Sequence, residues 1–179
     1  MTLEELWQLF PIFLVKPDPQ WKIWYAEERE RLLSFLPDGT RVSHIGSTAI
    51  DGIWAKNIVD ILIELPKGSS LAQVGELMEK YGYGCFSKPE KRMSFQRGYT
   101  EEGFAERVFH LHLRLAGDND ELYFRDFLNA HRDSALAYEK LKLNLWKQYE
   151  HDRDAYTAAK GEFVKECTRL AKQEFAGKY

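Results

Sequence analysis

The sequence has 179 residues, a formal net charge of −3, 44% hydrophobic residues and 30% charged residues. This length suffices for one domain with a sizeable core, and we expect a single domain over residues 1–179. The slightly acidic balance argues against a general nucleic-acid binder, because such proteins depend on a basic surface. A local basic pocket for one small anion is compatible with this composition.

The two cysteines and the N-terminal apolar run bear on the expected cellular compartment and on membrane association. Cys85 and Cys167 form no CxxC pair and no disulfide framework, so we expect reduced thiols in a cytoplasmic protein. The apolar run at residues 6–15 contains Pro11 and is too short to span a bilayer. We therefore expect it to pack onto the domain, and we expect no membrane association.

The first half of the chain predicts a helix, two strands and a second helix. Apolar residues recur at helical spacing over residues 18–35, and Pro37-Asp38-Gly39 ends that helix. Residues 42–45 form a short strand. Residues 57–65 are apolar on both faces, as in a central strand covered on two sides. Ser69 or Ser70 then caps a helix that runs to Gly82.

The second half predicts two more strands and then only helices. Residues 92–99 and 107–115 are the expected strands, and residues 120–130, 133–149 and 152–175 the expected helices. These elements predict an α+β fold: a small mixed sheet flanked by helices, with a helical C-terminal third.

The segment from His44 to Thr48 is a candidate phosphate-binding turn. A Gly-Ser pair after a strand lets backbone N–H groups approach a phosphate, and the hydroxyls of Ser47 and Thr48 add donors. The alternative is an ordinary strand-to-helix turn around Gly46.

Asp60 is the candidate catalytic and metal-binding acid. It lies inside an apolar strand, where an ionised carboxylate is costly unless it is paired or bound to a cation. Metal-dependent phosphoryl transfer needs carboxylates that hold Mg²⁺, and the expected partner two residues on is Leu62. Glu64 shares the face but lies about 13 Å along the strand, too far to share one ion. The pair of carboxylates usually found two residues apart in such sites is therefore incomplete here.

His110 and His112 point the same way from one predicted strand. Two imidazoles on one face can bind a metal, contact phosphate or transfer a proton. The competing interpretation is structural hydrogen bonding by at least one of them.

Two lysines are candidates for charge neutralisation. Lys160 lies on the apolar stripe of the last predicted helix, between Tyr156 and Phe163. A lysine on such a stripe either extends to the surface or meets an anion. Lys56 precedes the Asp60 strand and could face the same cleft.

Five segments together resemble the GrpB family, in order and across most of the chain. They are residues 44–63 (HIGSTAIDGIWAKNIVDILI), 107–113 (RVFHLHL), 124–131 (FRDFLNAH), 138–142 (YEKLK) and 156–164 (YTAAKGEFV).

The resemblance implies a nucleotidyltransferase-like fold of the polymerase-β superfamily. Gly46 and Ser47 then match the superfamily's first motif, and Asp60 matches its metal carboxylate. The GrpB-type signature further marks the remaining candidates, which are His44, Thr48, Lys56, His110, His112, Arg125 and Lys160. Leu62 departs from the superfamily pattern, and this departure weighs against standard two-metal transfer.

Three functions are compatible with these residues. In the first, Asp60 and His112 hold Mg²⁺ or Mn²⁺ while the Gly-Ser turn and the cationic side chains bind the phosphates during nucleotidyl or phosphoryl transfer. In the second, the same pocket binds a nucleotide or phosphorylated metabolite without converting it, which Leu62 favours. In the third, His110-Leu-His112-Leu-Arg114 acts like a histidine-triad hydrolase with His112 as the nucleophile.

Overall fold

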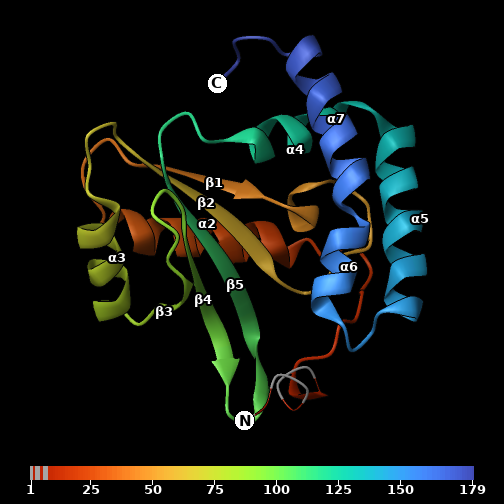
Figure 1. Cartoon of the computed structure of the whole chain (residues 1–179), viewed down its shortest axis with the longest axis horizontal. Helices are drawn as coiled ribbons and strands as arrows, with labels where there is room; N and C mark the ends of the chain where they lie inside the picture. Colours follow the sequence, from red (N-terminus) through yellow and green to blue (C-terminus); the bar gives the residue numbers. More distant parts are fainter. Residues whose placement is uncertain (1, 3–4, 6–7) are drawn as a thin grey trace.

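The protein is described by a computed structural model that covers residues 2, 5 and 8–179. Its centre is one mixed sheet with strand order β1-β2-β5-β4-β3 (Figure 1). The strands are β1 (Arg41–Ile45), β2 (Val59–Leu65), β3 (Gly84–Ser87), β4 (Met93–Thr100) and β5 (Gly103–Leu115). The helices are α2 (Gln20–Leu33), α3 (Leu71–Lys80), α4 (Asp120–Ala130), α5 (Arg132–Gln148), α6 (Arg153–Ala159) and α7 (Gly161–Glu174), with a short 3₁₀ turn η1 (Ser47–Ala49).

The pairing of the strands confirms the expected α+β class. The two central strands, β2 and β5, are parallel, whereas the other neighbours are antiparallel. A parallel pair needs a long connection, and here the connection from β2 to β5 contains α3, β3 and β4. The chain becomes helical after β5, as predicted.

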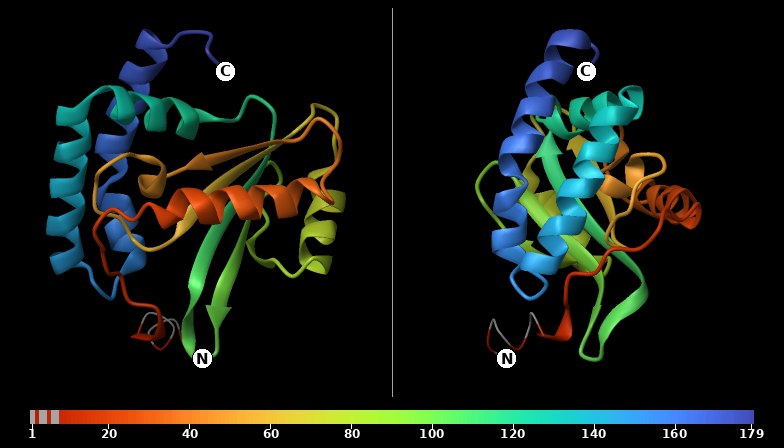
Figure 2. Two further views of the ribbon diagram at one scale, coloured as in Figure 1. Left: turned by 180° about the vertical axis from the view of Figure 1, so that it is seen from behind. Right: turned by 90° about the vertical axis from the view of Figure 1, so that its right-hand side faces the viewer.

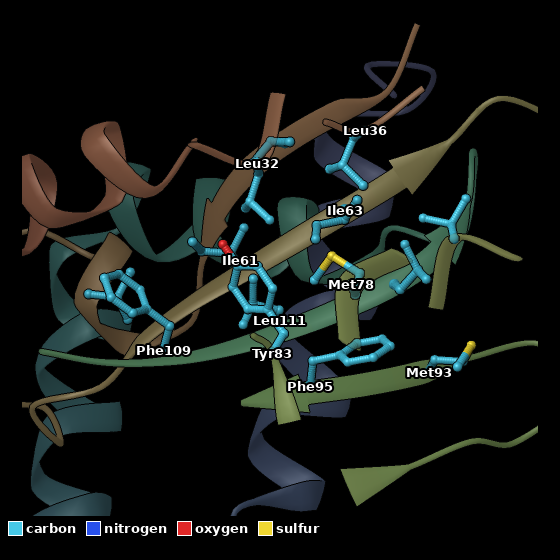
Figure 3. Close-up of a cluster of buried hydrophobic side chains, with 14 of the residues drawn as sticks. Leu32, Leu36, Ile61, Ile63, Met78, Tyr83, Met93, Phe95, Phe109 and Leu111 are labelled. Atoms are coloured by element: carbon cyan, nitrogen blue, oxygen red, sulfur yellow. The ribbon is translucent and has the colours of Figure 1, made fainter. Parts of the chain in front are cut away.

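One face of the sheet carries the main apolar core. Alternate residues of β2 and β5, such as Ile61, Ile63 and Leu111, are fully buried in one cluster with Phe95 of β4 (Figure 3). Helix α2 lies across this face, as the left view of Figure 2 shows, and α3 contributes Met78 to the same cluster. The alternation of the strands therefore fixes which side chains face these two helices.

The opposite face carries polar side chains. The register pairs Asp60 with His110 and Leu62 with His112, so all four side chains share this face. Helix α4 covers part of it, because Leu122 packs on Leu62. In Figure 1, α5, α6 and α7 stand beside the end of the sheet where β1 and β2 meet η1.

Three elements differ from the sequence prediction. Strand β3 was not predicted, and β5 begins at Gly103 rather than at residue 107. The predicted helix over residues 152–175 is two helices, α6 and α7, which meet at Lys160. Gly161 follows that junction directly, and glycine is a poor residue inside a helix, which favours a break there.

The N-terminal apolar segment packs onto the domain where the structure describes it. Phe10, Ile12 and Leu14 are buried, and Val15 pairs with Ala55 in an isolated bridge. Residues 6 and 7 of the predicted segment lie outside the described residues. Over the described part of the chain, no helix combines the length and hydropathy needed to cross a membrane.

Candidate functional site

Asp60 and the two histidines of β5 meet on the polar face of the sheet. Asp60 Oδ1 lies 3.6 Å from His110 Nδ1 and 3.4 Å from His112 Nε2. The three side chains are 29%, 17% and 25% exposed, so solvent reaches them. The structure thus brings together the three residues that the sequence nominated as catalytic.

The protonation of this group follows from its surroundings. Burial raises the pKa of the Asp60 carboxyl, but the adjacent imidazoles of His110 and His112 outweigh burial and hold that pKa well below its usual range. Burial also lowers the pKa of His110 against the opposing pull of Asp60. At neutral pH we therefore expect a carboxylate beside a neutral His110.

A chain of hydrogen bonds sets the tautomer of His110. Arg153 Nη1 donates to the Tyr99 hydroxyl at 2.9 Å, and that hydroxyl lies 2.6 Å from His110 Nε2. The ionised Asp60 carboxylate can only accept, so neutral His110 carries its proton on the nitrogen that faces Asp60 and accepts the hydroxyl proton of Tyr99 at Nε2. The ring proton of His110 then resides on Nδ1, which faces Asp60.

No second acid joins Asp60 on its strand. Leu62 is fully buried between Ile45 and Leu122. Glu64 is also buried, but its Oε1 accepts hydrogen bonds from the backbone N–H of Gly117 at 3.2 Å and from other donors. Glu64 therefore ties β2 to the turn before α4, which is a structural role.

These residues do not fit a two-ion magnesium centre. Mg²⁺ prefers oxygen ligands in near-octahedral geometry, and in the described part of the chain the carboxylate that contacts His110 and His112 is that of Asp60. Both imidazoles direct a nitrogen at Asp60 Oδ1, so they compete with a metal ion for that oxygen. Within the described residues, no group of three or more His, Cys, Asp or Glu side chains is arranged to hold a metal ion. Metal binding by Asp60 and His112 stays a prediction.

Three lysines gather around two buried tyrosines next to this group. Lys56 Nζ and Lys160 Nζ lie 5.4 and 4.5 Å from the centre of the Tyr156 ring. Lys142 Nζ lies 4.8 Å from the Tyr138 ring and donates to the carbonyl of Trp54. We call Lys56, Lys142 and Lys160 the lysine cluster.

The lysine cluster is poorly neutralised. Among the side chains that the structure describes, no ion pair includes any of its three members. Burial lowers the pKa of Lys56 and of Lys142 to about 7, and that of Lys160 to about 8. Lys160 and Arg153 further lower the pKa of Lys56, whereas Asp60 raises it.

The Gly-Ser turn fits closely against Asp60. Gly46 has φ +73°, and a Cβ built on it would lie 2.7 Å from Asp60 Oδ2. Only glycine meets both conditions without strain. Ser47 follows Gly46, and its side chain hydrogen-bonds with Tyr138. Burial raises the pKa of the Tyr138 hydroxyl to about 12, and the hydrogen bond with Ser47 opposes part of that rise.

His44 and Thr48 lie on the other side of the sheet. His44 pairs in register with Ile61, whose side chain faces α2, and its ring stacks on Tyr25 at 4.8 Å. Its Nε2 lies 2.8 Å from Thr48 Oγ1. Burial lowers the pKa of His44 to about 4, so the ring is neutral at pH 7. The structure therefore does not bring these two predicted phosphate ligands to Asp60.

Arg125 of α4 is engaged in contacts between structural elements. Its Nη1 donates to the carbonyl of His44 at 3.0 Å, its Nη2 to the hydroxyl of Tyr179 at 2.9 Å and its Nε to Asp126 at 2.8 Å. These contacts tie α4 to β1 and to the end of the chain. The guanidinium is thus placed apart from the lysine cluster.

The sequence interpretation missed three residues of the site: Tyr99, Lys142 and Arg153. One signal could have found Lys142. It lies four residues after Tyr138, as Lys160 lies four residues after Tyr156, and in both helical segments the ammonium group covers the tyrosine ring. No comparable pattern marks Arg153, because it reaches Tyr99 across 54 residues of chain.

Two hollows adjoin the site and share Arg153. One, of about 370 Å³, is lined by Lys56, Phe13 and Glu106 among others. The other, of about 530 Å³, is lined by His110 and Tyr99 among others. Both volumes lie within the range of small-molecule sites.

Residues 11–170 match the family profile described as GrpB protein. The chain belongs to the GrpB family. A relative named glutamate-rich protein GrpB, from Alkalihalophilus pseudofirmus, is 30% identical over 87% of this chain and 92% of its own length. A UPF0157 protein of Pseudomonas aeruginosa is 36% identical over 86% of this chain, and YqkA of Bacillus subtilis is 33% identical over 96%. This GrpB chain spans 64% and 51% of the length of the latter two proteins.

Solved structures confirm the fold of this GrpB protein. The crystal structure of GrpB from Enterococcus faecalis aligns with a TM-score of 0.77 at 24% identity, over 91% of this chain and 99% of that one. The Cid1 poly(U) polymerase aligns with a TM-score of 0.52 at 11% identity, over 82% of this chain and 46% of that one. The sheet is therefore of nucleotidyltransferase type, as the resemblance implied.

Proposed function

We propose that this GrpB protein binds a nucleotide or another phosphorylated small molecule, with the phosphates held by the lysine cluster and Arg153. The observation that carries the proposal is the set of three lysines, packed around Tyr138 and Tyr156, that form no ion pair with any side chain the structure describes. Lys142 is 1% exposed. Grouping such cations costs free energy, and a bound anion offsets that cost.

The positions of the charges indicate how a ligand lies. Ionised Asp60 repels phosphate oxygens, so the phosphates contact the lysine cluster rather than Asp60. Two buried polar atoms near the lysines, Arg153 Nε and the Tyr156 hydroxyl, form no hydrogen bond with residues 2, 5 and 8–179. Buried polar groups normally have partners, and phosphate oxygens would supply an acceptor for each.

The named relatives suggest which compounds to test first. The Cid1 structures contain magnesium with 3′-dATP, ATP or GTP, as their descriptions state. A protein called dephospho-CoA kinase, from Mycolicibacterium paratuberculosis, is 29% identical over 90% of this chain and 46% of its own length. ATP, GTP and dephospho-CoA are therefore the first ligands to test.

Thermal unfolding and calorimetry test the binding proposal. A ligand that binds only the folded state stabilises it by about 2.7 kcal/mol at 100 times its Kd. We expect such a stabilisation by at least one phosphorylated compound in the presence of EDTA, and its loss in Lys142→Met. Lys140→Met, an exposed lysine of the same helix, is the matched control. Absence of any shift with phosphorylated compounds would contradict the proposal.

Metal-dependent transfer is the second candidate function. It is supported by the magnesium nucleotides of the Cid1 structures and by the place of Asp60 on β2 of a sheet of the same type. Against it, an Asp60 with such a low pKa is a weak general base. Incubation with labelled ATP or GTP, Mg²⁺ or Mn²⁺ and a metabolite extract should transfer label. No transfer, or equal transfer by Asp60→Ala, would exclude this candidate.

Hydrolysis through His112 gains no support from the fold. The Nε2 of His112 is directed at Asp60, and the sheet is of nucleotidyltransferase type. Hydrolysis of nucleoside phosphoramidates that is abolished in His112→Ala would restore that hypothesis.

A further inference from the structure

The hollow of about 530 Å³ beside His110 has an aromatic lining that the phosphate-binding proposal does not use. Its walls include Phe10, Phe86, Gln96, Tyr99, His110 and Arg153. It lies over β4 and β5, because Gln96 is the register partner of His110 on the same face. The hollow is thus continuous with the face that carries Asp60.

The rings of this hollow form a surface that a flat ligand could cover. Phe86 of β3 is 54% exposed, and its ring centre lies 6.1 Å from that of His110. His110 stacks on Tyr99 with an angle of 15° between the rings, and Phe10 packs on Tyr99 at 4.8 Å. An exposed phenylalanine at the rim of a hollow gains from being covered by an apolar or aromatic group.

Two residues connect this hollow to the phosphate-binding side. His110 lines the hollow through its ring and faces Asp60 through Nδ1. Arg153 lines both this hollow and the one that contains Lys56. A ligand with a ring in the first hollow would therefore place an attached phosphate toward Arg153 and Lys56.

We propose that this hollow holds the heterocyclic base of the nucleotide whose phosphates the lysine cluster binds; the inference rests on the proposed function and specifies its substrate class. The base stacks on Phe86, while Gln96 offers its side-chain amide to the edge of the ring. Aromatic side chains with a few polar groups are the usual lining of such sites. Stacking of this kind tolerates different bases.

The other hollow is a poorer place for the base. It is smaller, about 370 Å³, and its lining contains the rings of Phe13 and Phe104. Both hollows are lined by charged side chains, Glu101 and Asp154 in the larger one, so the number of stacked rings rather than the charge distinguishes them. The exposed ring of the smaller hollow, Phe13, packs at 6.1 Å against Phe104 rather than against a residue of the Asp60 group. Phe13 therefore serves as the matched control for Phe86.

The test compares compounds with and without a base. The affinities of ADP, GDP, CDP and UDP are measured by calorimetry beside that of pyrophosphate, on the wild-type protein, Phe86→Ala, Phe86→Tyr and Phe13→Ala. We expect at least one nucleoside diphosphate to bind the wild type roughly tenfold or more tightly than pyrophosphate, as base stacking predicts. Phe86→Ala should remove most of that difference and leave pyrophosphate binding unchanged, whereas Phe86→Tyr and Phe13→Ala should retain it.

Each other outcome identifies what fails. If pyrophosphate binds as tightly as every nucleoside diphosphate, the base site is refuted and the phosphate site stands. A loss in Phe13→Ala instead of Phe86→Ala places the base in the other hollow and overturns this inference. If no compound binds, pyrophosphate included, the proposed function fails and the inference fails with it.

Discussion

Two of the places where the molecule buries charged side chains differ in whether the charge has a partner. Glu28, a residue of α2, is almost fully buried, but its carboxylate accepts hydrogen bonds from the Tyr83 hydroxyl at 2.5 Å and from Arg97 Nη1 at 2.6 Å. On the other side of the sheet, the lysine cluster has no ion-pair partner among the described side chains. The carboxylate of Glu28 is therefore neutralised within the protein, whereas the positive charge of the lysine cluster is available to a bound anion.

The largest loss of unfolding free energy for a single substitution is expected at the Glu28–Arg97 ion pair. Glu28→Gln leaves Arg97 without its counter-charge and weakens the bond from Tyr83. Because Arg97 is partly exposed and water screens part of the loss, we expect the free energy of unfolding to fall by about 2–3 kcal/mol. Urea unfolding measures this. A change below roughly 0.5 kcal/mol, the size of an ordinary surface substitution, would show that the pair is not structural.

Substitution in the lysine cluster should lower ligand affinity and leave the stability of the fold intact. Lys160→Met removes a cation but keeps the length of the side chain, so we expect unfolding stability to stay equal or rise. Affinity for the bound phosphate compound should fall about tenfold, which corresponds to about 1.4 kcal/mol. Lys165→Met, an exposed lysine of α7, is the control and should change neither quantity. A clear loss of stability in Lys160→Met would mean that this lysine supports the fold.

The side chains that lie on the α2 side of the sheet should matter for stability alone. Thr48→Val removes the hydrogen bond to His44 without changing size, and should lower the free energy of unfolding by about 1 kcal/mol. Ligand affinity should stay within a factor of two. A larger loss of affinity would show that Thr48 contacts the ligand, as the sequence had suggested.

The lysine cluster also makes stability and ligand affinity depend on pH, in opposite directions. The folded-state pKa values of Lys56, Lys142 and Lys160, about 7 to 8, lie below the ordinary value of 10.5. Between these values the unfolded chain binds more protons, so the lysines make stability rise with pH above 7. Phosphate affinity should fall over the same interval, because the neutral lysines lose their attraction for the anion. Parallel changes in stability and affinity between pH 7 and 9 would contradict this assignment.

The sequence predicted the half of the site that strands supply. The alternation of β5 places His110 and His112 on one face, and the apolar run of β2 marks that strand as central. That Asp60 meets the two histidines was a hypothesis, because a strand that is apolar on both faces does not show which way Asp60 points, and the register of β2 with β5 confirms it. The relation of the helices to the sheet could not be read in the same way. It depends on how α5 and α6 dock, and no local pattern fixes that.

The misplaced elements have local explanations. Strand β3 has only four residues, which is too short for a periodic pattern of apolar residues, and it exposes the ring of Phe86. His44 was grouped with Asp60 because the two fall within one motif. In the sheet, however, His44 is paired with Ile61 rather than with a residue of the Asp60 face, so it points to α2.

The break between α6 and α7 has a consequence for the energetics of the whole chain. The sheet supplies an acid and imidazoles, α5 and α6 supply Lys142 and Arg153, and Lys160 lies at the break itself. A molecule held between them would clamp the C-terminal helices onto the strands. Amide protons of α7 should then exchange more slowly when it is bound, although none of the proposed contacts belongs to that helix.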